Sequence, residues 1–195
     1  MRYRLSKGVI RGLLGCLSVG WLVGCTTPAP AERGFWIEPG VRASLPRTVC
    51  ESEGTVKAVL TARREGRTER VLTLRTCRAD RLTIDVLTLT GMALMTVTYD
   101  GTTLTRTAHV PIPTGLDASQ IVADVLLSSL PAPRWTSFLP QGYHWETVGT
   151  ERRLLNAERR VTERFQYDAE GRLQRLTHEA FGYSIDFRYL KETNR

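Results

Sequence analysis

The sequence predicts an α+β protein in which roughly ten antiparallel strands form one sheet and one or two helices cover a face of that sheet. Apolar residues recur at every second position in short segments over residues 55–110, and again over residues 144–190. Between these two runs lies the one stretch with convincing helical spacing. Short turn segments separate the strands, which is typical of an antiparallel meander.

The first run of strands begins near residue 55. Val56, Ala58 and Leu60 alternate with polar neighbours there, which is the period of a strand with one buried face. Residues 99–101 (YDG) then form a turn that predicts a hairpin. The strands of this run are expected within residues 55–64, 70–77, 81–89, 87–101 and 102–110.

The helix is expected between Asp117 and Pro131. Asp117 stands where an N-cap residue belongs, Gln120 follows three residues later, and Pro131 ends the segment. A short second helical turn is expected over residues 135–139. The second run of strands then falls within residues 144–149, 152–158, 160–168, 172–179 and 183–190.

Residues 1–24 have the pattern of a secretory signal. A basic head without acids precedes an apolar segment that is shorter than the about 20 residues of a membrane-spanning helix. Residues 22–25 (LVGC) resemble the lipobox of bacterial lipoproteins. This resemblance implies cleavage before Cys25 and acylation of its sulfur and of its new amine. Thr26, in place of an aspartate, then points to the outer membrane.

Two alternatives to cleavage at Cys25 stay open. Residues 13–16 spell the same pattern and end in Cys16, but the apolar run behind that cysteine is short and interrupted by Arg11. The other alternative is an uncleaved anchor, which the missing length disfavours. Two or three acyl chains hold a protein stably on a membrane, because each buried methylene contributes about 0.8 kcal/mol.

Cleavage changes the charge and the cysteine count of the chain. The full sequence has 27 basic and 20 acidic residues, and removal of the four bases in the signal lowers the net charge from +7 to +3. No basic run with interleaved aromatics stands out, so no nucleic-acid partner is expected. Cys50 and Cys77 are left in an oxidising periplasm, where they can form a disulfide. Spacing alone leaves two separate thiols as the alternative.

The rest of the chain is long enough for one domain with its own core, and we expect a monomer. Residues 25–43, which include Pro28 and Pro30, are expected to form the acylated cysteine and a flexible leash. Residues 44–195 are expected to form the folded domain.

Several segments together resemble the LolA/LolB family of lipoprotein carriers and outer-membrane receptors. They are LTG at residues 89–91, the helix DASQIVADVLLSSLP at residues 117–131, the segment 135–140 and the closing hairpins. Residues 82–190 resemble more closely a family of small LolB-like lipoproteins often found with aryl polyene synthesis genes. The resemblance implies an unclosed half-barrel whose concave apolar face is lidded by helices, with room between them for an acyl chain.

The resemblance also implies where cargo would be handled. In LolB, an apolar side chain on a protruding loop between two early strands is needed for placing lipoproteins into the membrane. Leu89 and Met92 lie in the matching loop here, which lacks the proline of that family, and both also suit ordinary strand-end positions. The expected lining of an apolar pocket is Ile84, Val86, Leu94, Val97, Ile121, Val125, Leu126, Trp135, Phe138, Trp145, Phe165, Phe187 and Tyr189. The same residues would suit a filled core, which only a volume distinguishes from a pocket.

The expected function is therefore that of a lipid-anchored protein on the periplasmic face of the outer membrane. It would bind an acyl chain or acylated cargo, a lipoprotein or a lipid-linked polyene, and help to place it in the membrane. A periplasmic carrier protein is the expected partner. The positive face toward it could be formed by Arg63, Arg64, Arg67, Arg70, Arg75 and Arg78.

A non-catalytic envelope scaffold and a lipid-acting hydrolase are the alternatives. His109, His144 and His178 show no metal-ligand spacing, and the sequence contains no nucleophile elbow and no glycine-rich phosphate loop. We therefore expect no enzyme, no cofactor and no metal. A hydrolase would need a polar cluster near His144 or His109.

Overall fold

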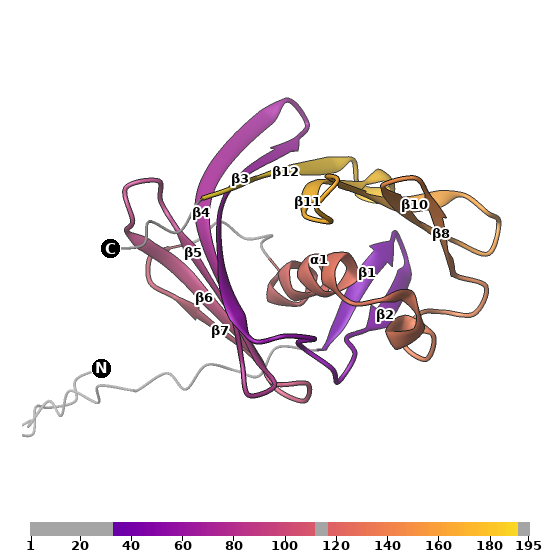
Figure 1. The fold of residues 1–195 in the computed structure, drawn as a ribbon, viewed down its shortest axis with the longest axis horizontal. Helices are drawn as coiled ribbons and strands as arrows, with labels where there is room; N and C mark the ends of the chain where they lie inside the picture. The colour runs from indigo at the N-terminus through magenta and orange to yellow at the C-terminus, as the bar shows by residue number, and fades with distance from the viewer. Residues whose placement is uncertain (1–32, 112–116, 191–195) are drawn as a thin grey trace, which may run out of the picture.

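The computed structural model describes residues 33–111 and 117–190. These residues form twelve strands, one α-helix and two short 3₁₀ helices, arranged as a curved sheet around a helix (Figure 1). The expected secretory signal, Cys25 and the first part of the expected leash lie outside the described residues.

Ten strands form one antiparallel sheet in the order β7-β6-β5-β4-β3-β12-β11-β10-β9-β8. Two five-stranded meanders, β3 to β7 and β8 to β12, are joined where β12 pairs with β3. Within the described residues β7 and β8 are the two edges, so the sheet is curved but unclosed (Figure 1). The ten strands are β3 (Gly54–Arg64), β4 (Arg67–Arg78), β5 (Arg81–Leu87), β6 (Ala93–Tyr99), β7 (Leu104–Ala108), β8 (His144–Val148), β9 (Glu151–Leu155), β10 (Val161–Tyr167), β11 (Leu173–His178) and β12 (Tyr183–Tyr189).

Helix α1 (Ala118–Ser129) lies inside the curve of the sheet, together with the hairpin of β1 (Gly34–Glu38) and β2 (Val41–Ser44) (Figure 1). The side chain of Asp117 accepts a hydrogen bond from the backbone N–H of Ser119 at 2.9 Å. The predicted N-cap is thereby confirmed. No helix in residues 33–111 or 117–190 is long and apolar enough to cross a membrane.

We call β5 to β7 and β8 to β11 the two arms of the sheet, on either side of the central strands β3, β4 and β12. The core lies on the concave side of both arms and around α1 and β1. It runs from β5, β6 and β7 through α1 and β1 to β9, β10 and β11. Val97, Leu126 and Phe165 are fully buried in it. Trp135 packs edge-on against Phe35, with ring centroids 6.0 Å apart. Helix α1 is therefore held by both arms of the sheet, and its position relative to the central strands is fixed.

Two expectations differ from the structure. Part of the expected leash, residues 34–43, forms β1 and most of β2, because Phe35 and Ile37 alternate with polar or exposed neighbours and are fully buried against the core. The second helical turn is the 3₁₀ helix η1 (Ala132–Trp135), which begins three residues before the expected one. Proline in its first turn has the backbone angle that a helix start requires.

Candidate functional site

The concave face of β3, β4 and β12 is mostly apolar and half-buried, although Ala58 and Thr73 in its middle are buried. Pairing aligns Leu60 with Val71 on one side and with Phe187 on the other, and directly opposed residues of antiparallel strands share a face. This part of the sheet differs from the two arms, whose concave residues belong to the core. The half-buried side chains that lie on this face outside the core cluster are Val56, Leu60, Val71, Ile185 and Tyr189.

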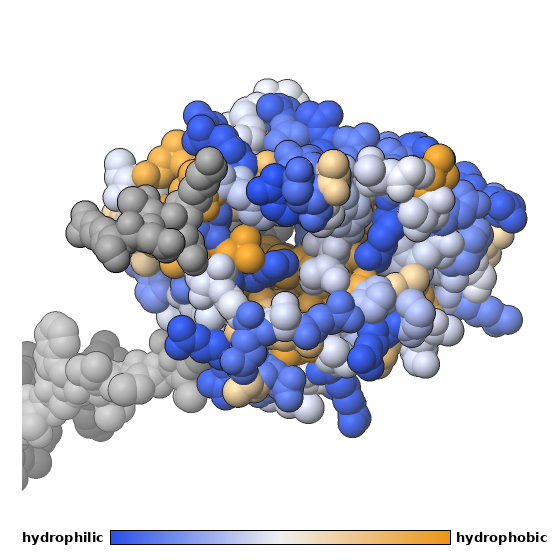
Figure 2. Space-filling model, viewed as in Figure 1, coloured by the Kyte–Doolittle hydropathy of each residue, from blue (hydrophilic) through white to orange (hydrophobic). Residues whose placement is uncertain are grey.

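Helix α1 forms the opposite wall. Its buried stripe, which includes Val122 and Leu126, faces the core, whereas Ile121 and Val125 lie on another side of the helix and are half-buried. Figure 2 shows the molecule hollowed near its centre, with hydrophobic side chains inside the hollow and hydrophilic ones around it. We call the space between α1 and the concave face of β3, β4 and β12 the apolar groove.

Small side chains lie in the middle of the floor of the groove. Ala58 pairs with Thr73, whose hydroxyl donates a hydrogen bond to the Ala58 carbonyl at 3.2 Å and so presents only its methyl group as further surface. The larger side chains of Tyr189 and Val86 flank this pair. Ala62 lies six positions after Val56 along β3, which gives a floor of about 20 Å at the rise of a strand.

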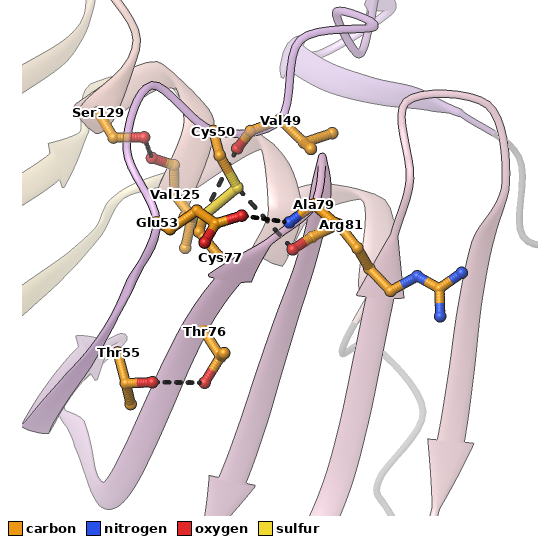
Figure 3. The surroundings of a disulfide bond; sticks show 10 residues. All are labelled: Val49, Cys50, Glu53, Thr55, Thr76, Cys77, Ala79, Arg81, Val125 and Ser129. Carbon is orange, nitrogen blue, oxygen red and sulfur yellow. Dashed lines mark hydrogen bonds between the residues drawn. A yellow bond between two sulfur atoms is a disulfide. The ribbon is translucent and has the colours of Figure 1, made fainter.

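A disulfide lies at one end of the groove. The sequence leaves open whether Cys50 and Cys77 are bonded, and the structure contains this bond, with Cα atoms 5.9 Å apart. Cys77 pairs with Leu82, a core residue, and therefore faces the concave side. Figure 3 shows Val49 and, from α1, Val125 among the residues around the bond. The disulfide thus ties the segment before β3 to the end of the groove.

The other end of the floor opens at the tip of the β3–β4 hairpin. Arg64 pairs there with Arg67 on one side and with Tyr183 on the other. A surface depression of about 490 Å³ lies at this tip and is lined from both β3–β4 and the β11–β12 connection, with His178 and Tyr183 among its residues. The apolar floor of the groove therefore ends in a more polar mouth with two arginines.

A polar cluster lies where α1 meets β12. The Tyr183 hydroxyl donates to the Asp124 carboxylate at 2.9 Å, and the Gln120 amide donates to the same carboxylate at 3.0 Å. Burial raises the pKa of Asp124 to about 7, although both hydrogen bonds favour the charged form and act in the opposite direction. Asp124 and Tyr183 link the helix to the sheet beside the groove.

Glu163 and His178 lie nearby on β10 and β11, fully buried. The atoms Glu163 Oε1 and His178 Nε2 are 3.5 Å apart. Burial raises the pKa of Glu163 well above its ordinary value, and the charge of Asp124 raises it further. Burial also lowers the pKa of His178 to about 4. Burial therefore shifts both pKa values toward the neutral form of each side chain, because a charge is disfavoured in a site without water.

The structure divides the thirteen expected pocket residues into four groups. Val86, Ile121, Val125, Phe187 and Tyr189 are half-buried and border the groove. Ile84, Val97, Leu126, Trp135 and Phe165 are buried in the packed core. Phe138 and Trp145 pack against the core from the side of β8. Leu94 lies on the convex face, because its neighbour Met95 pairs with Val86 on the concave one.

Sequence reasoning missed four groove residues: Val56, Leu60, Val71 and Ile185. The period-two pattern marks them as members of strand faces, but nothing in the sequence separates a face covered by the core from one that is left open. The arginines expected to form one positive face are also divided. Arg63, Arg70 and Arg78 lie on the convex face, whereas Arg64, Arg67 and Arg75 lie on the concave one.

The connection between β5 and β6 carries two exposed apolar side chains. Leu89 is 50% exposed and Met92 is 56% exposed. The turn is closed by hydrogen bonds from the Thr88 N–H to the Met92 carbonyl at 2.9 Å and from the Gly91 N–H to the Thr88 carbonyl at 3.0 Å. Both apolar side chains project from an ordered turn, which is the placement that the protruding-loop hypothesis requires.

The histidines are separated from one another. His109 contacts the Thr96 hydroxyl at 3.1 Å on the convex face, and His144 lies at the start of β8 on the far arm of the sheet. His178 is buried beside Glu163. Within the described residues no three His, Cys, Asp or Glu side chains are close enough to hold a metal ion.

The fold and the groove define an α+β protein with an open antiparallel half-barrel and a helix inside its curve. The family model described as "Protein of unknown function (DUF3261)" matches residues 55–191, and the chain belongs to this family. The matched region contains the strands of the groove floor, the wall formed by α1, and the polar cluster.

A solved structure described as a putative outer membrane lipoprotein-sorting protein domain from Vibrio parahaemolyticus is similar at 10% sequence identity. The match covers 72% of this chain and 86% of that chain with a TM-score of 0.26, a likeness too distant to support a function for this chain. A comparison with curated proteins gives no match.

Proposed function

We propose that this protein binds the acyl chain of a lipid or of an acylated cargo in the apolar groove, without a catalytic step. The observation that carries the proposal is the half-buried apolar face of β3, β4 and β12, which the core leaves open opposite Ile121 and Val125. An open apolar concavity is costly for a protein in water and is the usual form of a ligand site.

The size and chemistry of the groove suit a linear hydrocarbon. Its floor is about 20 Å long and offers methyl, methylene and aromatic groups from three neighbouring strands. Each methylene moved from water into such surroundings contributes about 0.8 kcal/mol, so ten of them would contribute about 8 kcal/mol before the entropy costs of binding. The sequence resemblance to the LolA/LolB family points to the same class of ligand.

We place this activity at the periplasmic face of the outer membrane, with Cys25 as the acylated anchor. Leu89 and Met92 would then enter the membrane surface during transfer of cargo, and a periplasmic carrier protein would deliver it. Because both side chains are exposed, Leu89→Ser with Met92→Ser should leave the free energy of unfolding within about 0.5 kcal/mol of wild type. The double variant should lose flotation with phospholipid vesicles when Cys25 is absent. Unchanged flotation would remove the loop from the proposal.

Lipid binding in the groove is tested by a substitution that fills the groove with a large side chain. Val71→Trp would place an indole over the floor beside Leu60, whereas Arg70→Trp adds the same group on the convex face of the same strand. Native mass spectrometry of the full-length protein in a non-ionic detergent should show a bound lipid on wild type and on Arg70→Trp, and none on Val71→Trp. A wild-type protein that is free of lipid and takes up no added fatty acid would refute the proposal.

An interaction module is the second candidate, and the convex face favours it. Leu72 and Leu87 are half-buried and are paired in register across β4 and β5. Together with the buried Val59 of β3 they form an apolar row on the side away from the groove. A protein partner would cover this row. Capture of a partner that is lost on Leu72→Asp, in a protein whose groove binds no lipid, would favour this function over lipid binding.

A further inference from the structure

We propose that Arg75 binds the anionic head of the ligand, and that the ligand is a linear apolar chain ending in a carboxylate. This inference rests on the proposed function and names the chemical class that the apolar groove takes. The chain would lie along the floor over Thr73 and Val71, with its carboxylate at the end of the groove near the disulfide.

The position of Arg75 is set by strand pairing. Arg75 is opposed by Val56 on β3 and by the core residue Ile84 on β5, so it lies on the concave face. Thr73 and Cys77 are the next residues of β4 on the same face. A half-buried guanidinium therefore lies at the disulfide end of the apolar floor, between hydrophobic neighbours on both adjacent strands.

Within the described residues, the Arg75 guanidinium forms no ion pair with a carboxylate. Burial lowers the pKa of Arg75, and the neighbouring Tyr189 offsets this effect only in part. A half-buried charge without a partner costs free energy that an anion would offset.

Two other polar side chains of the concave face donate hydrogen bonds to backbone carbonyls near the end of α1. Arg152 donates to the Leu127 carbonyl at 2.9 Å, and the Tyr167 hydroxyl donates to the Ser128 carbonyl at 2.7 Å. These bonds tie α1 to the far arm of the sheet and have an evident structural role. Arg75 makes no such bond within the described residues, so a role in holding the fold does not explain its place at the end of an apolar groove.

A carboxylate matches this site in charge and shape. One guanidinium carries one positive charge, and its planar fork can donate two parallel hydrogen bonds to the two oxygens of a carboxylate. A neutral ester could fill the apolar floor equally well but would leave the arginine unpaired. The head group therefore sets specificity, while the hydrocarbon supplies most of the affinity.

The experiment compares three probes with the same chain and different heads: palmitate, methyl palmitate and hexadecyl phosphate. Each is titrated against the full-length protein in a non-ionic detergent, and the bound fraction is measured by native mass spectrometry. The wild-type protein should bind palmitate about 10- to 100-fold more tightly than methyl palmitate, the range expected for a hydrogen bond to a charged group. Arg75→Gln should abolish this difference by weakening palmitate binding alone, and Arg75→Lys should retain part of it.

Arg70→Gln is the matched control, because Arg70 lies on the convex face of the same strand. Unchanged binding of methyl palmitate by Arg75→Gln shows that its groove is folded. Equal binding of palmitate and methyl palmitate by wild type would overturn the role of Arg75 and leave the proposed function standing. Tighter binding of hexadecyl phosphate than of palmitate would overturn the assignment of a carboxylate. Failure of all three probes to bind wild type would refute both proposals.

Discussion

Asp124→Asn should stabilise the protein at pH 8 and do so much less at pH 5. Asp124 is half-buried between α1 and β12, and its pKa is raised from 3.8 to about 7 mainly by desolvation. Between pH 4 and pH 7 the folded protein keeps a proton that the unfolded chain releases. The free energy of unfolding therefore falls as the pH rises through this window and is level above it.

The size of the effect is set by the pKa difference. Each pH unit in this window costs about 1.4 kcal/mol, so the advantage of the asparagine variant should grow by about 3 kcal/mol between pH 5 and pH 8. An asparagine keeps the shape of the side chain, and its carbonyl oxygen can still accept the hydrogen bond from Tyr183. The assay is urea unfolding of residues 32–195, followed by tryptophan fluorescence at both pH values.

Asp186→Asn is the control on the convex face. Arg175 donates to Asp186 at 2.6 Å and lowers its pKa, an effect that burial partly offsets, so the stability due to this carboxylate is present above pH 4 and is lost only as the pH falls further. Its substitution should destabilise the protein by the same small amount at pH 5 and at pH 8. An Asp124→Asn variant whose advantage does not grow with pH, or that is less stable than wild type at pH 8, would refute the assigned burial of Asp124.

Two further predictions concern covalent and backbone constraints. Reduction of the bond between Cys50 and Cys77, whose residues are 27 apart, should lower the free energy of unfolding by about 3.5 kcal/mol, and urea curves with and without a reductant measure it. Gly101→Ala should cost at least about 2 kcal/mol, because its added Cβ would lie 2.2 Å from the Arg47 carbonyl oxygen at a φ of +84°. Gly149→Ala shares the positive φ but meets no atom within 4 Å, so a loss as large as that of Gly101→Ala would contradict the steric argument.

The strands and the helix could be predicted because their signals are local. Val56, Ala58 and Leu60 define a strand by alternation, and Asp117 defines the start of α1 by its capping chemistry. The hairpin of β1 and β2 was missed because five residues with two buried positions give too short a pattern next to prolines that suggest a leash. Short elements depend on tertiary packing for their stability, which local sequence does not report.

The sequence by itself determined an antiparallel α+β domain, the position of its helix and the two cysteines able to bond. It did not determine which face of a strand is covered. In β4 the face with Leu72 and Leu74 is the more apolar, yet the structure turns Val71, Thr73 and Arg75 to the concave side. Only the tertiary structure decided this. Helix α1 is held by the two arms of the sheet and covers the central strands only in part, and burial is a property of the assembled layers.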